Sequence, residues 1–385
     1  MKSLKKGFLN ALSPAVGGLT AAGIVFSYTF AAFSCLGLNI YYALSGAVIC
    51  LILSAALKDE VLAPDSFLLV PVVFTVTAAG FCYLPVSVFG GALLFVLLKP
   101  LLKKIKIPGC IIAGAALGLA FSATALFTTY YFGIGASGSY TFEILKNYRY
   151  LGFHPNWRGV FYGTITLFAM ITYPFKFKKL SKYLPAEVFS VAIPFILNLF
   201  LNPDKETAPI LEVGTLSDVF SLSGVKSFLP FLGIESEKGL IPSLQSGFSV
   251  TLILLAYKCS GLKDTAVFTS CNALSGAVGA LPSRGYSVRR YTPVSAITAV
   301  IALTAVVLLF PSLLSRVPVH SLAVVLIVSA WQNVPFSAVA ASFKEKGILE
   351  IAAVIGIFAS FLFFNSFWAL LICIVFTVIV KAVRK

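Results

Sequence analysis

Long uncharged stretches dominate the chain. Residues 7–57, 66–98, 107–142 and 351–380 contain no Asp, Glu, Lys or Arg. A membrane-spanning helix needs about 20 apolar residues, so the longest of these stretches hold two helices each. The pattern predicts an all-α polytopic membrane protein with about fourteen segments. The expected spans are 15–36, 39–57, 65–80, 83–99, 107–128, 158–175, 184–201, 243–261, 264–280, 283–291, 294–312, 317–334, 346–363 and 365–380.

Composition agrees with a lipid environment. The chain is 59% hydrophobic and 11% charged, whereas a soluble domain carries about 25% charged residues. Such a sequence lacks the polar groups needed to cover a water-facing surface. Its net charge of +15 would favour nucleic acid in a soluble protein, but a membrane protein gathers Lys and Arg in its cytoplasmic loops. We therefore expect the lipid bilayer, and no nucleic acid, as a partner.

The distribution of positive charge tests the number of segments. With the N-terminus inside, most of the 29 Lys and Arg residues fall in inside loops, among them the clusters at 99–106 and 176–182. This alternation predicts an even number of crossings, with both termini in the cytoplasm and the chain in the inner cell membrane. The first apolar run is followed by more apolar sequence, so it indicates a spanning helix rather than a cleavable signal. The polar stretches 129–157 and 202–240 would form short amphipathic or extended pieces on the outer face.

Residues for metal or covalent chemistry are sparse. The seven cysteines show no CxxC spacing and are interpreted as small buried hydrophobes. His154 and His320 lie near predicted loops and far apart in the sequence. We expect no metal and no cofactor, and an enzyme in the membrane is not favoured because such sites need clustered His, Asp or Glu.

Two breaks interrupt the helical pattern in matching ways. At residues 61–67 and 280–287, an apolar stretch leads to Pro64 or Pro282, then to small or polar residues, and then to a new segment. Proline suits a first helical turn. The predicted topology sends these segments from opposite sides to mid-membrane, as in transporters with inverted repeats. Two half-helices with their positive N-termini at one cavity would suit an anion. The alternative is a pair of ordinary proline kinks.

At these residues the chain resembles the SulP/SLC26 anion transporters. The resemblance rests on residues 270–276, 279–285 and 289–293, which follow an N-x-x-S…G-A-x-P…R…T-P order. Residues 17–20, 61–72 and 320–331 resemble the first, third and twelfth helices of that family. The resemblance covers nearly the whole membrane part. The membrane domain alone is expected, without the C-terminal STAS domain that usually follows it.

The resemblance implies a fold and a site. It implies a seven-plus-seven inverted repeat of the SLC26/UraA-like type with two half-helices, interleaved core and gate subdomains, and a homodimer. The first repeat would span 1–201, an extracytoplasmic loop 202–240 and the second repeat 241–385. The substrate would bind between the third and tenth half-helices, with help from helices one and eight. The candidate substrate-binding residues are Ser27, Tyr28, Asp65, Ser66, Phe67, Tyr257, Lys258, Ser283, Arg284, Gly285 and Tyr286.

Three charged candidates each allow two interpretations. Arg284 either binds an oxyanion through parallel hydrogen bonds, or faces the outer vestibule or pairs with Asp65. Asp65 either caps its helix or pairs with Arg284, or it couples transport to a proton or cation. Lys258 either snorkels to the interface, or supplies the fixed charge that replaces a coupling cation. The predicted eighth helix contains no carboxylate, where bacterial members of the family often have one.

The leading functional hypothesis is a secondary transporter of a small anion, working by alternating access. Sulfate, bicarbonate, chloride and carboxylates are the candidate substrates, and a proton or sodium ion is the candidate coupling ion. One alternative is an anion channel. Another is a proton-coupled nucleobase carrier on the same fold, which would need carboxylates in the eighth and tenth segments, where this chain has none.

Overall fold

The computed structural model describes residues 2–37, 40–57, 60–98, 107–202, 234, 239–259, 271–276, 279–288, 291–344 and 347–383, and their side chains except those of 2–13, 40, 42, 182, 258 and 259. Its elements in chain order are α1 (Lys2–Cys35), α2 (Ile40–Ser54), β1 (Glu60–Pro64), α3 (Ser66–Ala79), η1 (Phe81–Tyr83), α4 (Leu84–Leu98), α5 (Gly109–Phe132), α6 (Thr141–Leu151), α7 (Trp157–Lys176), η3 (Leu180–Lys182), α8 (Ala186–Leu201), α11 (Leu240–Cys259), β2 (Ser283–Ser287), α13 (Pro293–Leu309), α14 (Pro311–Leu314), α15 (Val319–Gln332), α16 (Phe336–Lys344), α17 (Ile348–Phe363) and α18 (Ser366–Val383).

The all-α membrane architecture is confirmed. Within the described ranges, five helices are long and apolar enough to cross a membrane, or six if the bent pair of α15 and α16 forms one span. Five further apolar helices are shorter, including α3 and α13. The predicted segment 264–280 lies mostly outside the described residues, so the number of fourteen segments stays a prediction.

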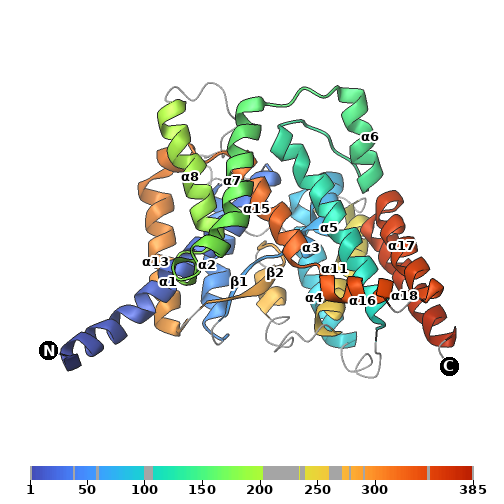
Figure 1. The fold of residues 1–385 in the computed structure, drawn as a ribbon, viewed down its shortest axis with the longest axis horizontal. Helices are drawn as coiled ribbons and strands as arrows, with labels where there is room; N and C mark the ends of the chain where they lie inside the picture. The colour runs from blue at the N-terminus through green and yellow to red at the C-terminus, as the bar shows by residue number, and fades with distance from the viewer. Residues whose placement is uncertain are drawn as a thin grey trace.

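The two breaks lie side by side. Strands β1 and β2 pair antiparallel, with Pro64 opposite Ser283 and Glu60 opposite Ser287. The amide of Asp65 extends the pairing by donating to the Pro282 carbonyl at 3.1 Å. Figure 1 shows these strands near the centre of the helix bundle. The predicted meeting of the two proline breaks, which are far apart in the sequence, is therefore confirmed.

The second half-helix, predicted at 283–291, is wrong in the part of it that the structure describes. Residues 283–287 form β2, and the next helix, α13, begins at Pro293. The N-terminus of α13 is stabilised at this position, because Thr292 and Ser295 form a capping box and Pro293 occupies the first turn. The five residues between β2 and α13 leave too little chain for a half-helix of eight or more residues. Among the described residues, α3 alone brings a helix N-terminus to the junction of the strands.

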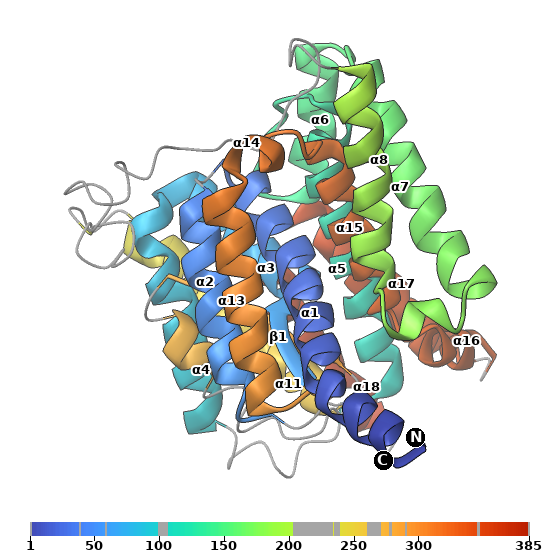
Figure 2. The same cartoon turned by 90° about the vertical axis from the view of Figure 1, so that its left-hand side faces the viewer.

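Small residues set the closest helix contacts. A Cβ on Gly91 of α4 would lie 2.5 Å from the Gly247 carbonyl oxygen of α11, and Thr251 donates a hydrogen bond to the Gly91 carbonyl at 2.7 Å. A Cβ on Gly18 of α1 would lie 2.6 Å from the Ser295 carbonyl oxygen of α13. Such close approach of backbones is the usual packing device of membrane helices. Figure 2 shows α1 and α13 lying side by side.

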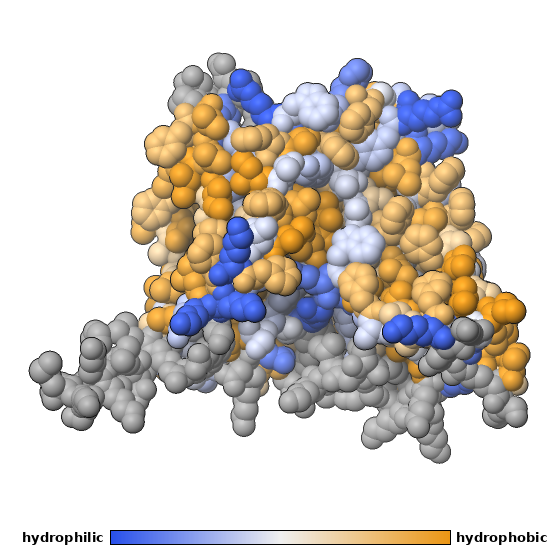
Figure 3. Space-filling view, viewed as in Figure 1, coloured by the Kyte–Doolittle hydropathy of each residue, from blue (hydrophilic) through white to orange (hydrophobic). Residues whose placement is uncertain are grey.

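The outer surface agrees with a bilayer setting. Figure 3 shows a largely apolar face, with hydrophilic residues concentrated toward its upper and lower margins. The start of α1 and the end of α18 both lie at the lower margin in Figure 1. In the polar stretch 129–157 the structure forms the short helix α6, while most of 202–240 lies outside the described residues. His320, expected near a loop, lies in the first turn of α15 and is fully buried, with Gly159 of α7 packed against its ring.

Candidate functional site

A cavity of about 180 Å³ lies beside the start of α3. Its wall combines Phe67 of α3 and Tyr257 of α11 with Arg284 of β2 and Asn333, which follows α15. Gln332 and Pro335 flank Asn333 in the wall, and apolar side chains of α5, α11 and α18 complete the lining, namely Ile112, Ala115, Ala116, Leu119, Ile253, Ala256 and Leu370. A few polar groups in an otherwise apolar cavity are typical of a small-molecule site.

Asp65 sits at the N-terminus of α3 and is fully buried. Its Oδ1 accepts hydrogen bonds from the amides of Phe67 and Leu68, at 3.0 and 3.2 Å, and from the Tyr257 hydroxyl at 2.7 Å. Its Oδ2 accepts from Asn333 Nδ2 at 2.8 Å. The side chain therefore caps the helix, and its negative charge lies at the positive end of the helix dipole.

Arg284 reaches the same carboxylate from β2. Its Nε lies 3.7 Å from Asp65 Oδ2, and one terminal nitrogen donates to Asn333 Oδ1. The guanidinium also stacks over the Tyr286 ring, 5.1 Å from its centroid. About a quarter of the Arg284 side chain is accessible, against none of Asp65. The structure shows that Asp65 caps α3 and pairs with Arg284. Arg284 pairs with Asp65 and also lines the cavity.

Two aromatic pairs surround this ion pair. Tyr286 stacks on Tyr28 of α1 with the ring centroids 4.6 Å apart, and the Tyr28 hydroxyl donates to Glu187 Oε1 of α8 at 3.1 Å. Phe67 and Tyr257 lie nearly parallel, 6.4 Å apart. The aromatic rings hold Arg284 and Asp65 in a mostly apolar shell, which strengthens their attraction relative to water.

Other predicted residues lie away from the cavity or have structural partners. Ser66 donates to the Leu326 carbonyl at 2.8 Å, and the backbone of Ser283 is held by Asn272. Gly285 lies against Glu60, where a Cβ would collide with the carboxylate. The side chain of Lys258 lies outside the described residues.

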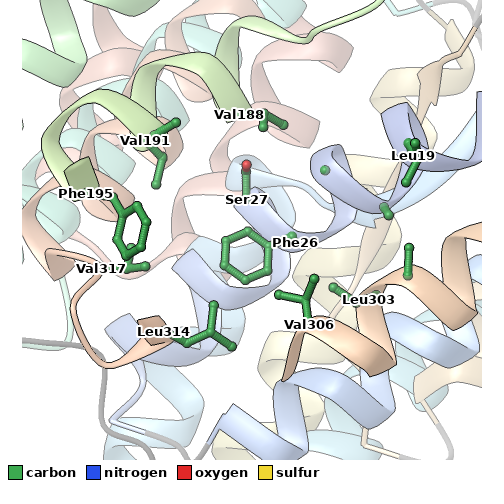
Figure 4. Close-up of a pocket in the computed structure, with 14 residues that line it drawn as sticks. Leu19, Phe26, Ser27, Val188, Val191, Phe195, Leu303, Val306, Leu314 and Val317 are labelled. Carbon is green, nitrogen blue, oxygen red and sulfur yellow. The ribbon is translucent and has the colours of Figure 1, made fainter. Parts of the chain in front are cut away.

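Ser27 belongs to a second, apolar cavity of about 320 Å³, which is formed mainly by α1, α8 and α13. Figure 4 shows its hydroxyl among Phe26, Val188 and Val191, with no polar neighbour labelled. Ser27 Oγ is buried without a hydrogen-bond partner among the described residues. Successive residues of a helix point about 100° apart, so Ser27 faces this apolar cavity while its neighbour Tyr28 points toward Tyr286.

Sequence reasoning missed Asn333 and Glu187. Asn333 contacts both charges of the ion pair, and Glu187 receives the Tyr28 hydroxyl. Each had a weak signal in the sequence: Gln332 and Asn333 are adjacent amides at the end of an apolar span, and Glu187 is the single charged residue of the predicted span 184–201. Neither signal indicates which partner the side chain meets.

The arrangement favours reversible binding over covalent chemistry. Arg284 has five N–H donors, and the contacts above use two of its nitrogens. Arg284 lines the cavity and is partly accessible, so its remaining donors could bind a small anion there through charge-assisted hydrogen bonds. No group of three or more His, Cys, Asp or Glu side chains among the described residues is placed to hold a metal ion.

Comparisons with known proteins place the fold. No family model and no curated protein matches the sequence. Among solved structures, the transmembrane domain of the cyanobacterial bicarbonate transporter BicA matches with a TM-score of 0.64 and 16% identity, covering 95% of this chain and 98% of that one. The murine anion transporter Slc26a9 in the inward-facing state matches with a TM-score of 0.69 and 12% identity, over 97% of this chain and 68% of that one. A second SLC26A9 structure matches with a TM-score of 0.69 and 11% identity, over 97% of this chain and 66% of that one. The chain thus has the fold of the SLC26 and BicA membrane domains, as the sequence resemblance predicted.

Proposed function

We propose that the protein is a secondary transporter of a small anion and that it works by alternating access. The fold is shared with a bicarbonate transporter and with an anion transporter. The observation that carries the proposal is the position of Arg284, partly accessible on the wall of an apolar cavity beside the N-terminus of α3. A guanidinium and a helix N-terminus both favour a negatively charged ligand.

The packing of the helices supports a division into two moving parts. One block consists of α1, α2, β1, β2, α3, α4, α11 and α13, which pack mainly on one another; the other consists of α5, α6, α7, α8, α15, α16, α17 and α18. We assign the first as the core and the second as the gate. The cavity lies between them, because Arg284, Phe67 and Tyr257 come from the core and Asn333 and Leu370 from the gate. Movement of one block against the other would open the cavity to each side in turn.

We propose that the chain lies in the inner membrane with both termini in the cytoplasm. The clustered Lys and Arg residues support cytoplasmic termini in the inner membrane, and the ends of α1 and α18 at one margin are consistent with both termini on one side. We propose inverted repeats at 1–201 and 241–385, joined by the extracytoplasmic loop 202–240, and a homodimer as the assembly.

Counterflow in proteoliposomes tests the function. Purified protein is reconstituted in vesicles loaded with unlabelled anion, and uptake of radiolabelled chloride, formate, bicarbonate, sulfate and succinate is measured with each anion as competitor. We expect saturable counterflow with at least one of them. Arg284→Ala should lower it by about tenfold or more, because a charged hydrogen-bond partner contributes about 1.5–3 kcal/mol. Arg284→Lys should retain part of it, since Lys keeps the charge without the planar fork.

Arg149→Ala provides the matched control, because Arg149 is exposed on α6. Flux that rises linearly with concentration and shows no counterflow would favour an anion channel. Competition by uracil, and by none of the anions, would favour the nucleobase carrier. Unchanged counterflow in Arg284→Ala would overturn the site.

A further inference from the structure

The anion-binding position at the N-terminus of α3 is already occupied by a carboxylate of the chain itself. Asp65 receives two backbone amides of α3, the Tyr257 hydroxyl, the Asn333 amide and the charge of Arg284. These are the kinds of donors that bind free anions at helix N-termini. A carboxylate offers about four acceptor sites, and this one receives four hydrogen bonds and the ion pair with Arg284. The side chain of Asp65 therefore occupies the place of a bound anion.

The ion pair makes the site electrically neutral when no substrate is present. Arg284 contributes one positive charge and Asp65 one negative charge, 3.7 Å apart at their nearest atoms. An unpaired buried charge costs several kcal/mol. If Arg284 had no counter-ion, the binding site could change from one side of the membrane to the other at low cost only with an anion bound. Because Asp65 pairs with Arg284, the empty site can also make this change.

We propose that Asp65 is a tethered counter-anion of Arg284, which a monovalent substrate anion displaces as Asp65 takes up a proton from the same aqueous side. This inference rests on the proposed function and specifies its coupling. In the loaded site, Arg284 pairs with the anion and Asp65 is neutral, so the net charge is again zero. On the opposite side the anion and the proton both leave, and the carboxylate returns to Arg284.

The geometry indicates which oxygen receives the proton. Oδ1 accepts three hydrogen bonds, from Phe67, Leu68 and Tyr257, whereas Oδ2 contacts Asn333 and Arg284 among the residues that the structure describes. A new O–H bond on Oδ2 leaves the helix cap on Oδ1 intact. The Asn333 amide carries both donors and an acceptor, so by turning over it accepts the new hydrogen after Arg284 has moved to the anion.

The surroundings of Asp65 contain few other titratable groups. Tyr257 of α11 donates a hydrogen bond to it, and Arg284 of β2 pairs with it. The Tyr286 hydroxyl, also from β2, donates to the neighbouring Pro64 carbonyl at 3.3 Å. Asn333 and Ser329 approach from the α15 side and do not titrate. Glu187 of α8 connects only through Tyr28 and its stack on Tyr286. Asp65 is thus the carboxylate in direct contact with Arg284 among the described residues.

Two transport modes measured on one preparation test the proposal. Counterflow needs no return of the empty site, whereas proton-driven net uptake into anion-free vesicles does. Radiolabelled chloride and formate are the probes, with the external medium more acidic than the interior. The unmodified protein should show both modes. Asp65→Asn keeps a good helix cap, and its proton-driven net uptake should fall by about tenfold or more relative to its own counterflow, because Arg284 is then unpaired in the empty site.

Glu143→Gln in α6 is the matched control for a change of carboxylate to amide, and it should retain both modes. A second measurement uses the unmodified protein and therefore does not depend on the folding of the variant. When chloride is added to weakly buffered protein with a pH indicator, about one proton should be consumed per anion bound. Proton-driven uptake that survives in Asp65→Asn, loss of both modes together, or anion binding without proton uptake would each overturn the proposal. Absence of counterflow in the unmodified protein would instead remove the proposed function, and this inference with it.

Discussion

At the scale of single residues, the site is a charge pair with one neutral mediator. Asn333 donates to Asp65 and accepts from Arg284 at the same time. It is also the single polar contact from the gate block to both charges among the described residues. Asn333 therefore links the two blocks at the point where substrate would bind. A charge placed at this position should interact electrostatically with both Asp65 and Arg284.

The charge at position 333 should control anion affinity. Asn333→Asp adds a carboxylate next to Asp65 Oδ2, competes for Arg284 and repels an incoming anion. The half-saturating concentration for counterflow should rise by about tenfold above that of Asn333→Ala, which removes the amide without adding charge; this corresponds to about 1.4 kcal/mol. Affinities measured at mildly alkaline pH give the comparison. Equal affinities for the two variants would show that local negative charge has no effect on binding.

Single residues also show how far sequence reasoning reached. Tyr28, Asp65, Phe67, Tyr257, Arg284 and Tyr286 meet around the ion pair. Unusual residues next to the proline breaks could be recognised from local sequence. Ser27 could not be separated from Tyr28 in this way, because the direction of a side chain in a helix depends on what packs around it. The partners Asn333 and Glu187 come from distant helices, and local sequence carries no information on such pairings.

At the scale of elements, the two halves of the strand junction are unequal. β1 leads into α3, which supplies a capped N-terminus, while β2 leads within five residues into α13. Where the sequence predicted the positive end of a second half-helix, the described residues place β2, and Arg284 of this strand supplies the positive charge. One helix dipole and one guanidinium thus take the place of two helix dipoles, and the added full charge gives Asp65 a partner.

Two adjacent glycines of α4 test the helix packing. Gly91→Ala would place a methyl group 2.5 Å from the Gly247 carbonyl oxygen, whereas Gly90 has no atom within 4 Å of its added Cβ. We expect Gly91→Ala to destabilise the protein by about 1–3 kcal/mol through overpacking. Gly90→Ala should be neutral or slightly stabilising, since Ala favours a helix over Gly by about 1 kcal/mol. Thermal unfolding in detergent measures both. A similar midpoint for the two variants would contradict the close contact of α4 with α11.

At the scale of the whole molecule, the division into two blocks predicts relative motion. In the proposed division α1 belongs to the core and α8 to the gate, and they approach at Gly23 and Val188, where a Cβ on Gly23 lies 3.7 Å from Val188 Cβ. This distance suits a disulfide. In a variant without the seven native cysteines, oxidation of the Gly23→Cys, Val188→Cys pair should stop counterflow, and reduction should restore it.

A pair inside the core is the control for this cross-link. The Cβ positions of Gly46 and Ala280 lie 3.6 Å apart, and both residues belong to the part that holds the strands. Oxidation of the Gly46→Cys, Ala280→Cys pair should leave counterflow nearly unchanged. If both cross-links inhibit equally, or neither does, the proposed boundary between core and gate is wrong. Mass spectrometry of the oxidised protein verifies that each disulfide has formed.

The sequence by itself determined the solvent, the helical class and the two places where the chain breaks. These follow from local physics: uncharged runs need lipid, and proline limits where a helix starts. Only the tertiary structure decided that the second break forms a strand, that Asp65 fills the anion position, and that Asn333 joins the charges. These outcomes depend on contacts between residues some 220 to 270 positions apart, whose free energies no local pattern encodes.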